Sequence, residues 1–142
     1  MESLQGGRRL VQRGDEEVVV RDLGRTGTAS ERAAEVRFPA PWPRRFGGYA
    51  VAPAGGLVVF AGLHALRAVD PAGKVRWEIR HRCWAGCPGH DGFDEYAGDP
   101  GHRFGSSGSA GFSADGTLVW AHVPARWHRS RPSAKGGWRS GW

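Results

Sequence analysis

The sequence predicts an all-β protein built around a four-stranded antiparallel meander. Three observations support this fold class. Short apolar or alternating segments recur over residues 47–80, and turn-forming residues separate them. Hydrophobic residues make up 39% of the 142-residue chain, which is enough for a small β core. No apolar run reaches the 18 residues of a membrane-spanning helix.

The four expected strands are short and closely spaced. One of them, Leu57–Ala61, is almost continuously apolar, as is typical of a strand buried on both faces. The last one alternates, so that Val75, Trp77 and Ile79 share one face. The strands are expected at Tyr49–Ala52, Leu57–Ala61, His64–Val69 and Lys74–Arg80.

The rest of the chain divides by composition. Residues 1–14 are polar and predict a disordered N-terminus, and residues 15–46 form a lead-in with strand-like segments at Glu16–Val20 and Glu35–Phe38. A glycine-rich stretch at 81–107, here called the Cys/His loop, is followed at 108–124 by two more strand-like segments. Residues 125–142 form a basic, tryptophan-rich tail that is expected to be disordered.

Two hairpin motifs carry a resemblance to known repeats. The stretch 68–77, Ala-Val-Asp-Pro-Ala-Gly-Lys-Val-Arg-Trp, resembles the repeat of quinoprotein-type β-propellers, and 112–119, Phe-Ser-Ala-Asp-Gly-Thr-Leu-Val, resembles the turn of WD-like repeats. The resemblance implies one complete propeller blade at 47–80 and a partial second blade at 108–124. It also implies purely architectural roles: Asp70, Gly73, Asp115 and Gly116 make hairpins, and Trp77 and Trp120 pack in the blades.

Chain length bears on what this resemblance means. Propellers have typically 4–8 blades of about 40 residues, which is more than this chain can supply. We therefore expect the chain to assemble with copies of itself or to be part of a longer propeller, with a protein partner or the remaining blades completing it. The resemblance favours a non-enzymatic interaction module, since such folds host many functions.

The Cys/His loop holds the one group with recognisable chemistry. Cys83 and Cys87 are separated by three residues, and His90 and His102 follow. Thiolates and imidazoles are the ligands that zinc prefers, so these four residues predict a metal site, and zinc is the cofactor that would suit it. The eleven residues between the two histidines exceed the usual three to five, and ordinary loop residues are the alternative reading. A cysteine nucleophile with a histidine base is a third, which would make the chain an enzyme.

The basic tail has two interpretations besides plain disorder. Five of the 20 basic residues lie in 125–142, which contains no acidic residue and no Leu, Ile, Val or Phe. Because Arg, Trp, Gly, Ser, Pro and Ala are what GC-rich DNA encodes out of frame, we expect a frameshift near codon 125 of a longer gene. The alternative is nucleic-acid binding through phosphate contacts and stacking, which the near-neutral remainder of the chain does not favour.

Location in the cell is predicted from absences. No apolar segment of a secretory signal occurs in residues 1–14, and two cysteines do not form a disulfide framework. The sequence therefore predicts a cytoplasmic protein with free thiols and no membrane association.

Overall fold

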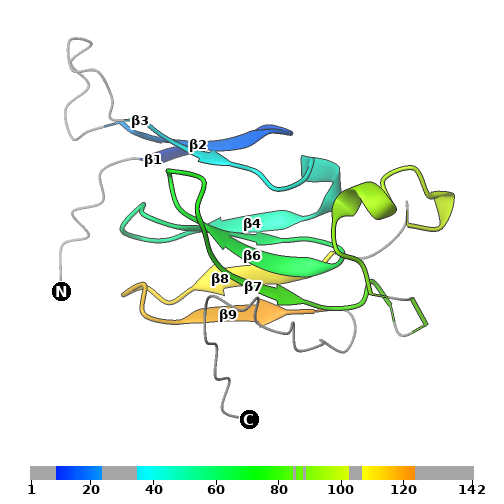
Figure 1. The fold of residues 1–142 in the computed structure, drawn as a ribbon. Helices are drawn as coiled ribbons and strands as arrows, with labels where there is room; N and C mark the ends of the chain where they lie inside the picture. Colours follow the sequence, from blue (N-terminus) through cyan, green and yellow to red (C-terminus); the bar gives the residue numbers. More distant parts are fainter. Residues whose placement is uncertain (1–8, 24–34, 85, 88, 103–106, 124–142) are drawn as a thin grey trace.

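The protein is an all-β molecule of three antiparallel sheets stacked in layers (Figure 1). The computed structural model describes residues 9–23, 35–84, 86–87, 89–102 and 107–123. Over these residues the sheets have 3, 4 and 2 strands, joined by three short 3-10 helices and no α-helix. Within the same residues no helix is long and apolar enough to cross a bilayer.

The middle layer is the predicted four-stranded meander. Its strands pair in chain order, β4-β5-β6-β7, with antiparallel register throughout. All four residues of β5 are buried, which confirms that this strand is covered on both faces. The bounds are β4, Gly48–Val51; β5, Val58–Ala61; β6, Ala65–Val69; and β7, Val75–Arg80.

The first layer contains one strand more than the sequence analysis expected. It consists of β1 (Arg9–Arg13), β2 (Glu17–Asp22) and β3 (Glu35–Pro39) in the order β1-β2-β3. The prediction that residues 1–14 are disordered was therefore wrong over β1. This polar strand is held by pairing with β2 and by two arginines that donate to backbone carbonyls: Arg9 to Ala52 at 3.1 Å and Arg13 to Trp42 at 2.8 Å.

The third layer is a hairpin that lies against the middle sheet. It is formed by β8 (Ser109–Phe112) and β9 (Val119–His122), and β8 contacts β4 and β5. The incomplete second unit predicted at 108–124 thus contains the two strands expected of it. The predicted disorder of residues 1–8 and the basic tail lies outside the described residues.

Both predicted hairpin turns form, and in each the side chain of the aspartate accepts hydrogen bonds from the turn. Asp70 accepts a hydrogen bond from Lys74 N at 2.9 Å, and Gly73 takes φ 82°. Asp115 accepts from Ser113 Oγ at 2.6 Å and from the Thr117 amide at 3.0 Å, while Gly116 takes φ 74°. These positive φ angles require glycine in the last turn position. The hydrogen bond from Ser113, together with those from Thr117, lowers the pKa of Asp115 to about 2.

The two tryptophans expected to pack inside the sheets differ in how far they are buried. Trp77 is half-buried on β7, whereas Trp120 on β9 is 60% exposed. The expectation of a packed Trp120 was wrong because the outer face of the third layer meets no further sheet among the described residues. The aromatic residue that does occupy the core is Trp42, which is 2% exposed and lies in the proline-flanked segment after β3.

The main core lies between the first and middle layers and continues into the Cys/His loop. Trp42 contacts Phe60 of β5 and His64 in the β5–β6 turn edge to face, with ring centroids 6.5 and 5.3 Å apart. The same apolar cluster includes Cys83, Cys87 and Tyr96 from the loop. The loop is therefore packed onto one end of the sheets rather than extended into solvent, as Figure 1 shows at the right of the molecule.

Candidate metal centre

The Cys/His loop begins at the end of β7 and is folded by a series of tight turns. The amide of His81 donates to His64 O at 2.7 Å, which fixes the start of the loop beside the β5–β6 turn. The Cys87 amide donates to Trp84 O at 3.1 Å, so the two cysteines bracket a turn. Two 3-10 helices then reverse the chain, η2 (Phe93–Glu95) and η3 (Pro100–His102).

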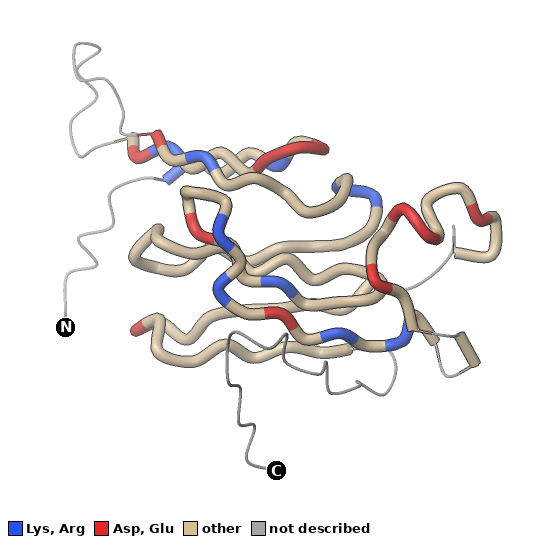
Figure 2. Tube along the Cα trace, in the orientation of Figure 1, with Lys and Arg blue, Asp and Glu red and all other residues tan. Residues whose placement is uncertain are grey.

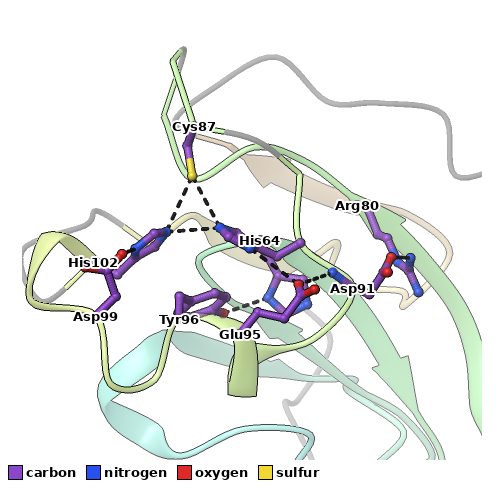
Figure 3. Close-up of polar contacts among 9 residues, drawn as sticks. His64, Arg80, Cys87, Asp91, Glu95, Tyr96, Asp99 and His102 are labelled. Atoms are coloured by element: carbon purple, nitrogen blue, oxygen red, sulfur yellow. Dashed lines mark hydrogen bonds and ion pairs between the residues drawn. The ribbon is translucent and has the colours of Figure 1, made fainter.

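These turns bring the four predicted ligands together. One ligand atom of each of Cys83, Cys87, His90 and His102 lies within 4.8 Å of the others. Cys87 Sγ is 3.3 Å from His90 Nε2 and 3.4 Å from His102 Nε2, and the two nitrogens are 3.2 Å apart. In Figure 3 dashed lines join Cys87 to His102 and to a second, unlabelled imidazole, and join the two imidazoles to each other. The eleven-residue separation of the histidines is therefore accommodated by η2 and η3.

A carboxylate lies behind each histidine. Asp99 Oδ2 is 2.8 Å from His102 Nδ1, and Glu95 Oε2 is 3.4 Å from His90 Nδ1 (Figure 3). Both carboxylates also accept backbone amides, Asp99 from Gly101 at 2.8 Å and Glu95 from Asp91 at 2.6 Å. These amides, followed by the imidazoles, lower the pKa of both carboxyls, which favours their ionised forms.

An aromatic side chain connects the ligands to the meander. The Tyr96 ring stacks on the His102 ring, with centroids 4.9 Å and planes 15° apart, and its hydroxyl is 2.6 Å from His64 Nδ1. Tyr96 is 1% exposed, and burial raises the pKa of its hydroxyl, so this group stays protonated. The Trp84 ring also contacts His102, with ring centroids 4.5 Å apart.

Both thiols are buried, and burial disfavours the thiolate form of Cys83. Cys83 and Cys87 are free cysteines, each 2% exposed. Burial, together with the neighbouring Cys87, raises the pKa of the Cys83 thiol to about 12. A thiolate is stable in such surroundings when a cation is bound to it. The arrangement thus suits metal ligation and opposes a role for Cys83 as a free nucleophile.

The sequence predicted the four residues of the cluster but not the residues that support them. The sequence analysis assigned no role to Asp99 and Glu95, which face His102 and His90 respectively. Tyr96 and His64 drew no functional interpretation at all. The one sequence signal for these partners is the spacing Asp99-x-x-His102, which in a tight turn places the carboxylate beside the imidazole.

Fold and site together define an all-β protein with a Cys₂His₂ cluster in the loop between its second and third sheets. Comparisons with protein-family models, curated proteins and solved structures found no match. The functional argument therefore depends on the chemistry of the site itself.

Proposed function

We propose that this protein binds a zinc ion through Cys83, Cys87, His90 and His102, and that the ion fixes the Cys/His loop against the meander. The observation that carries the proposal is the spacing of the ligand atoms. Zinc bonds of about 2.0–2.1 Å to nitrogen and about 2.3 Å to sulfur, at tetrahedral angles, separate two nitrogens by about 3.3 Å and nitrogen from sulfur by about 3.5 Å. The corresponding distances here are 3.2 Å between nitrogens and 3.3 and 3.4 Å between nitrogen and sulfur.

The tautomers of the histidines support the same proposal. Each imidazole has its Nδ1 beside a carboxylate and its Nε2 within the cluster. A carboxylate that accepts the Nδ1 proton leaves the Nε2 lone pair available to a metal and makes it a stronger donor. Two such lone pairs 3.2 Å apart repel one another unless a cation or a proton lies between them.

The number and burial of the ligands favour a structural role for the ion. Four protein ligands complete the tetrahedral coordination of zinc and leave no position for a substrate or a catalytic water. Three of the four residues are buried, so the ion would be largely shielded from solvent. An ion that joins residues 83 and 87 to residue 102 also closes a loop rich in glycine, which carries a large conformational entropy when unfolded.

The metal content of the purified full-length chain tests this proposal. After dialysis we expect about one zinc ion per chain by elemental analysis, and Cys87→Ser and His102→Gln each to abolish it. His122→Gln is the matched control, because His122 is exposed on β9 and distant in sequence from the cluster. Cobalt substitution adds a readout that reports ligand type, since thiolate coordination gives charge-transfer absorption that Cys87→Ser should weaken. A folded chain without metal, or variants that keep it, would contradict the proposal.

A second candidate function is an interaction module of the propeller type. It is supported by the order of the layers: β3 and β7, the last strands of their sheets, each lead into the first strand of the next sheet, and the first strands β4 and β8 lie against one another. Blades of four-stranded sheets arranged around a central axis follow this path. In this proposal the Asp115-Gly116 hairpin belongs to a second blade that further strands complete.

The coding sequence provides the test of this second candidate. We expect translation of another frame beyond codon 125 to continue with alternating strands and Asp-Gly turns. Early stop codons in every other frame would contradict the idea of a shifted frame. Independently, β1, β2 and β3 should pair as a blade with a fourth strand in the assembled protein, and a structure of the assembly that leaves that sheet three-stranded would count against it.

A further inference from the structure

The ring of Tyr96 contacts both histidines of the Cys₂His₂ cluster, although Tyr96 is not a member of the cluster. It stacks on the His102 ring, with centroids 4.9 Å and planes 15° apart (Figure 3). It also contacts the His90 ring, with centroids 5.2 Å apart and an interplanar angle of 59°. One side chain outside the cluster is therefore in contact with two of the four proposed ligands.

The carboxylates beside the histidines do not fix the imidazole rings completely. Asp99 and Glu95 each contact one atom of an imidazole, Nδ1, and thereby hold its proton. Their side chains are 48% and 44% exposed, and they belong to the acidic residues of the loop, drawn in red at the right of Figure 2. An aromatic ring packed on an imidazole restricts the tilt of its plane, in which the Nε2 lone pair lies. The stack on Tyr96 therefore fixes the plane of His102.

Tyr96 is itself held by residues outside the Cys/His loop. The side chain is 1% exposed, and its ring packs edge to face on Phe46, with centroids 5.5 Å and planes 88° apart. The hydroxyl lies 2.6 Å from Nδ1 of His64, a buried residue of the β5–β6 turn 32 positions away along the chain. The position of Tyr96 is therefore determined by the packed sheets as well as by the loop.

The arrangement of the ligands needs such support before an ion binds. The two Nε2 atoms are 3.2 Å apart, and their lone pairs repel one another at this distance. Conformations of the loop in which the histidines separate relieve this repulsion. The apparent affinity for a metal falls in proportion to the fraction of chains in the binding conformation. Contacts that do not involve the ion raise this fraction, and Tyr96 makes such contacts with both histidines.

We propose that Tyr96 is a positioning residue for His90 and His102, and that its hydrogen bond to His64 makes zinc affinity depend on the meander. This inference rests on the proposed zinc site. It gives His64, which is not a member of the cluster, an effect on metal affinity that acts through the Tyr96 hydroxyl.

Zinc affinities of the full-length chain and its variants, measured by competition with a chromophoric chelator, test the proposal. Tyr96→Phe keeps the ring and loses the hydrogen bond, so we expect zinc binding to weaken about 2–10-fold. Tyr96→Leu also loses both ring contacts, which should weaken binding by about a further tenfold. Phe93→Leu is the matched control, because Phe93 lies in η2 of the same loop and its ring contacts Phe46. It should bind zinc as the wild type does.

A double-mutant cycle tests the part played by His64. His64→Phe keeps a ring beside Trp42 but removes the hydrogen-bond partner of Tyr96. We expect it to weaken zinc binding as much as Tyr96→Phe does, and the double variant to bind no more weakly than either single variant, because each removes the same hydrogen bond.

The spectrum of the cobalt-loaded protein separates positioning from folding. The d–d bands respond to the geometry of the ligands, so they should change in Tyr96→Leu and stay unchanged in Phe93→Leu. Circular dichroism checks that each loaded variant is folded. If Tyr96→Leu does not fold, the cycle of Tyr96→Phe and His64→Phe decides the question alone.

Several outcomes would overturn the inference. Wild-type affinity in both Tyr96 variants would show that Tyr96 does not position the histidines, and an equal loss in Phe93→Leu would show a general effect of the loop core. Additive losses in the cycle would show that His64 acts through packing and not through the Tyr96 hydroxyl. A wild-type chain that binds no zinc contradicts the zinc site itself, whereas a wild-type chain that binds zinc beside unaffected variants contradicts the role of Tyr96 alone.

Discussion

His102 is the residue at which most of the site converges. Its Nε2 faces Cys87 and His90, its Nδ1 faces Asp99, and its ring contacts the rings of Tyr96 and Trp84. The side chain is 5% exposed, so its orientation is set by these contacts and not by solvent. A ligand held on every side loses little conformational entropy when a metal binds.

At this scale we predict that Asp99→Asn weakens zinc binding by about 10–100-fold, because the amide no longer fixes the Nδ1 proton as a carboxylate does. A competition titration with a chromophoric chelator measures the change. Asp94→Asn is the control, since Asp94 is an exposed acidic residue of the same loop and lies outside the Cys₂His₂ cluster. Equal affinities of the Asp99 and Asp94 variants would show that the carboxylate does not orient His102.

The sequence predicted the Cys and His residues of the cluster but not the carboxylates that contact them. Cys83, Cys87, His90 and His102 were predicted because ligand chemistry restricts zinc sites to a few side chains. Asp99 and Glu95 were not, because a carboxylate in a polar loop has the same local pattern whether it faces solvent or an imidazole. Only the path of the chain through η2 and η3 decides between the two.

At the scale of elements, the connection between β5 and β6 packs closely against Trp42. Gly62 lies in this turn and donates its amide to Ala65 O at 2.9 Å. A Cβ at this position would lie 2.5 Å from the Trp42 ring, which is itself buried. The turn and the proline-flanked segment after β3 therefore approach each other as closely as glycine allows.

We predict that Gly62→Ala destabilises the protein by about 1–3 kcal/mol, because the buried indole cannot move away from the added methyl group. Chemical denaturation of the zinc-loaded protein measures the loss. Gly56→Ala is the control, as it lies in the neighbouring β4–β5 turn with nothing within 4 Å of the added carbon. If both substitutions cost the same, the effect comes from glycine flexibility in turns and not from contact with Trp42.

Strands whose apolar and polar side chains alternate were predictable from the sequence, and strands held by contacts with distant residues were not. The strands of the meander and of the hairpin were predicted within a residue or two, because alternating side chains and Asp-Gly turns are local signals. β1 was missed because its stability depends on pairing with β2 and on arginine contacts 29 and 43 residues away along the chain. Such contacts leave no pattern in the strand itself.

At the scale of the whole molecule, His64 connects the sheets to the metal loop. It is fully buried in the β5–β6 turn, contacts Trp42, and pairs with the Tyr96 hydroxyl. Its Nε2 atom is buried without a hydrogen-bond partner in the described structure. Because a protonated imidazole here would lose its hydration, burial lowers the pKa of His64 to about 4 from an ordinary value of 6.5.

This shift predicts how the stability of the molecule depends on pH. Below pH 6.5 the unfolded chain binds a proton at His64, whereas the folded chain does not until pH approaches about 4. The free energy of unfolding should therefore fall as pH falls through this window, by roughly 3 kcal/mol from this residue. Burial also lowers the pKa of His81, which acts in the same direction.

The variant His64→Asn, compared with wild type at equal zinc loading, tests this prediction. It should lower stability at neutral pH because packing is lost, but the free energy of unfolding should depend less steeply on pH between 6.5 and 4. His81 and the residues of the proposed zinc site are present in both proteins and contribute alike to the two slopes. Parallel slopes in denaturation series would therefore show that the acid sensitivity arises at those groups and not at His64.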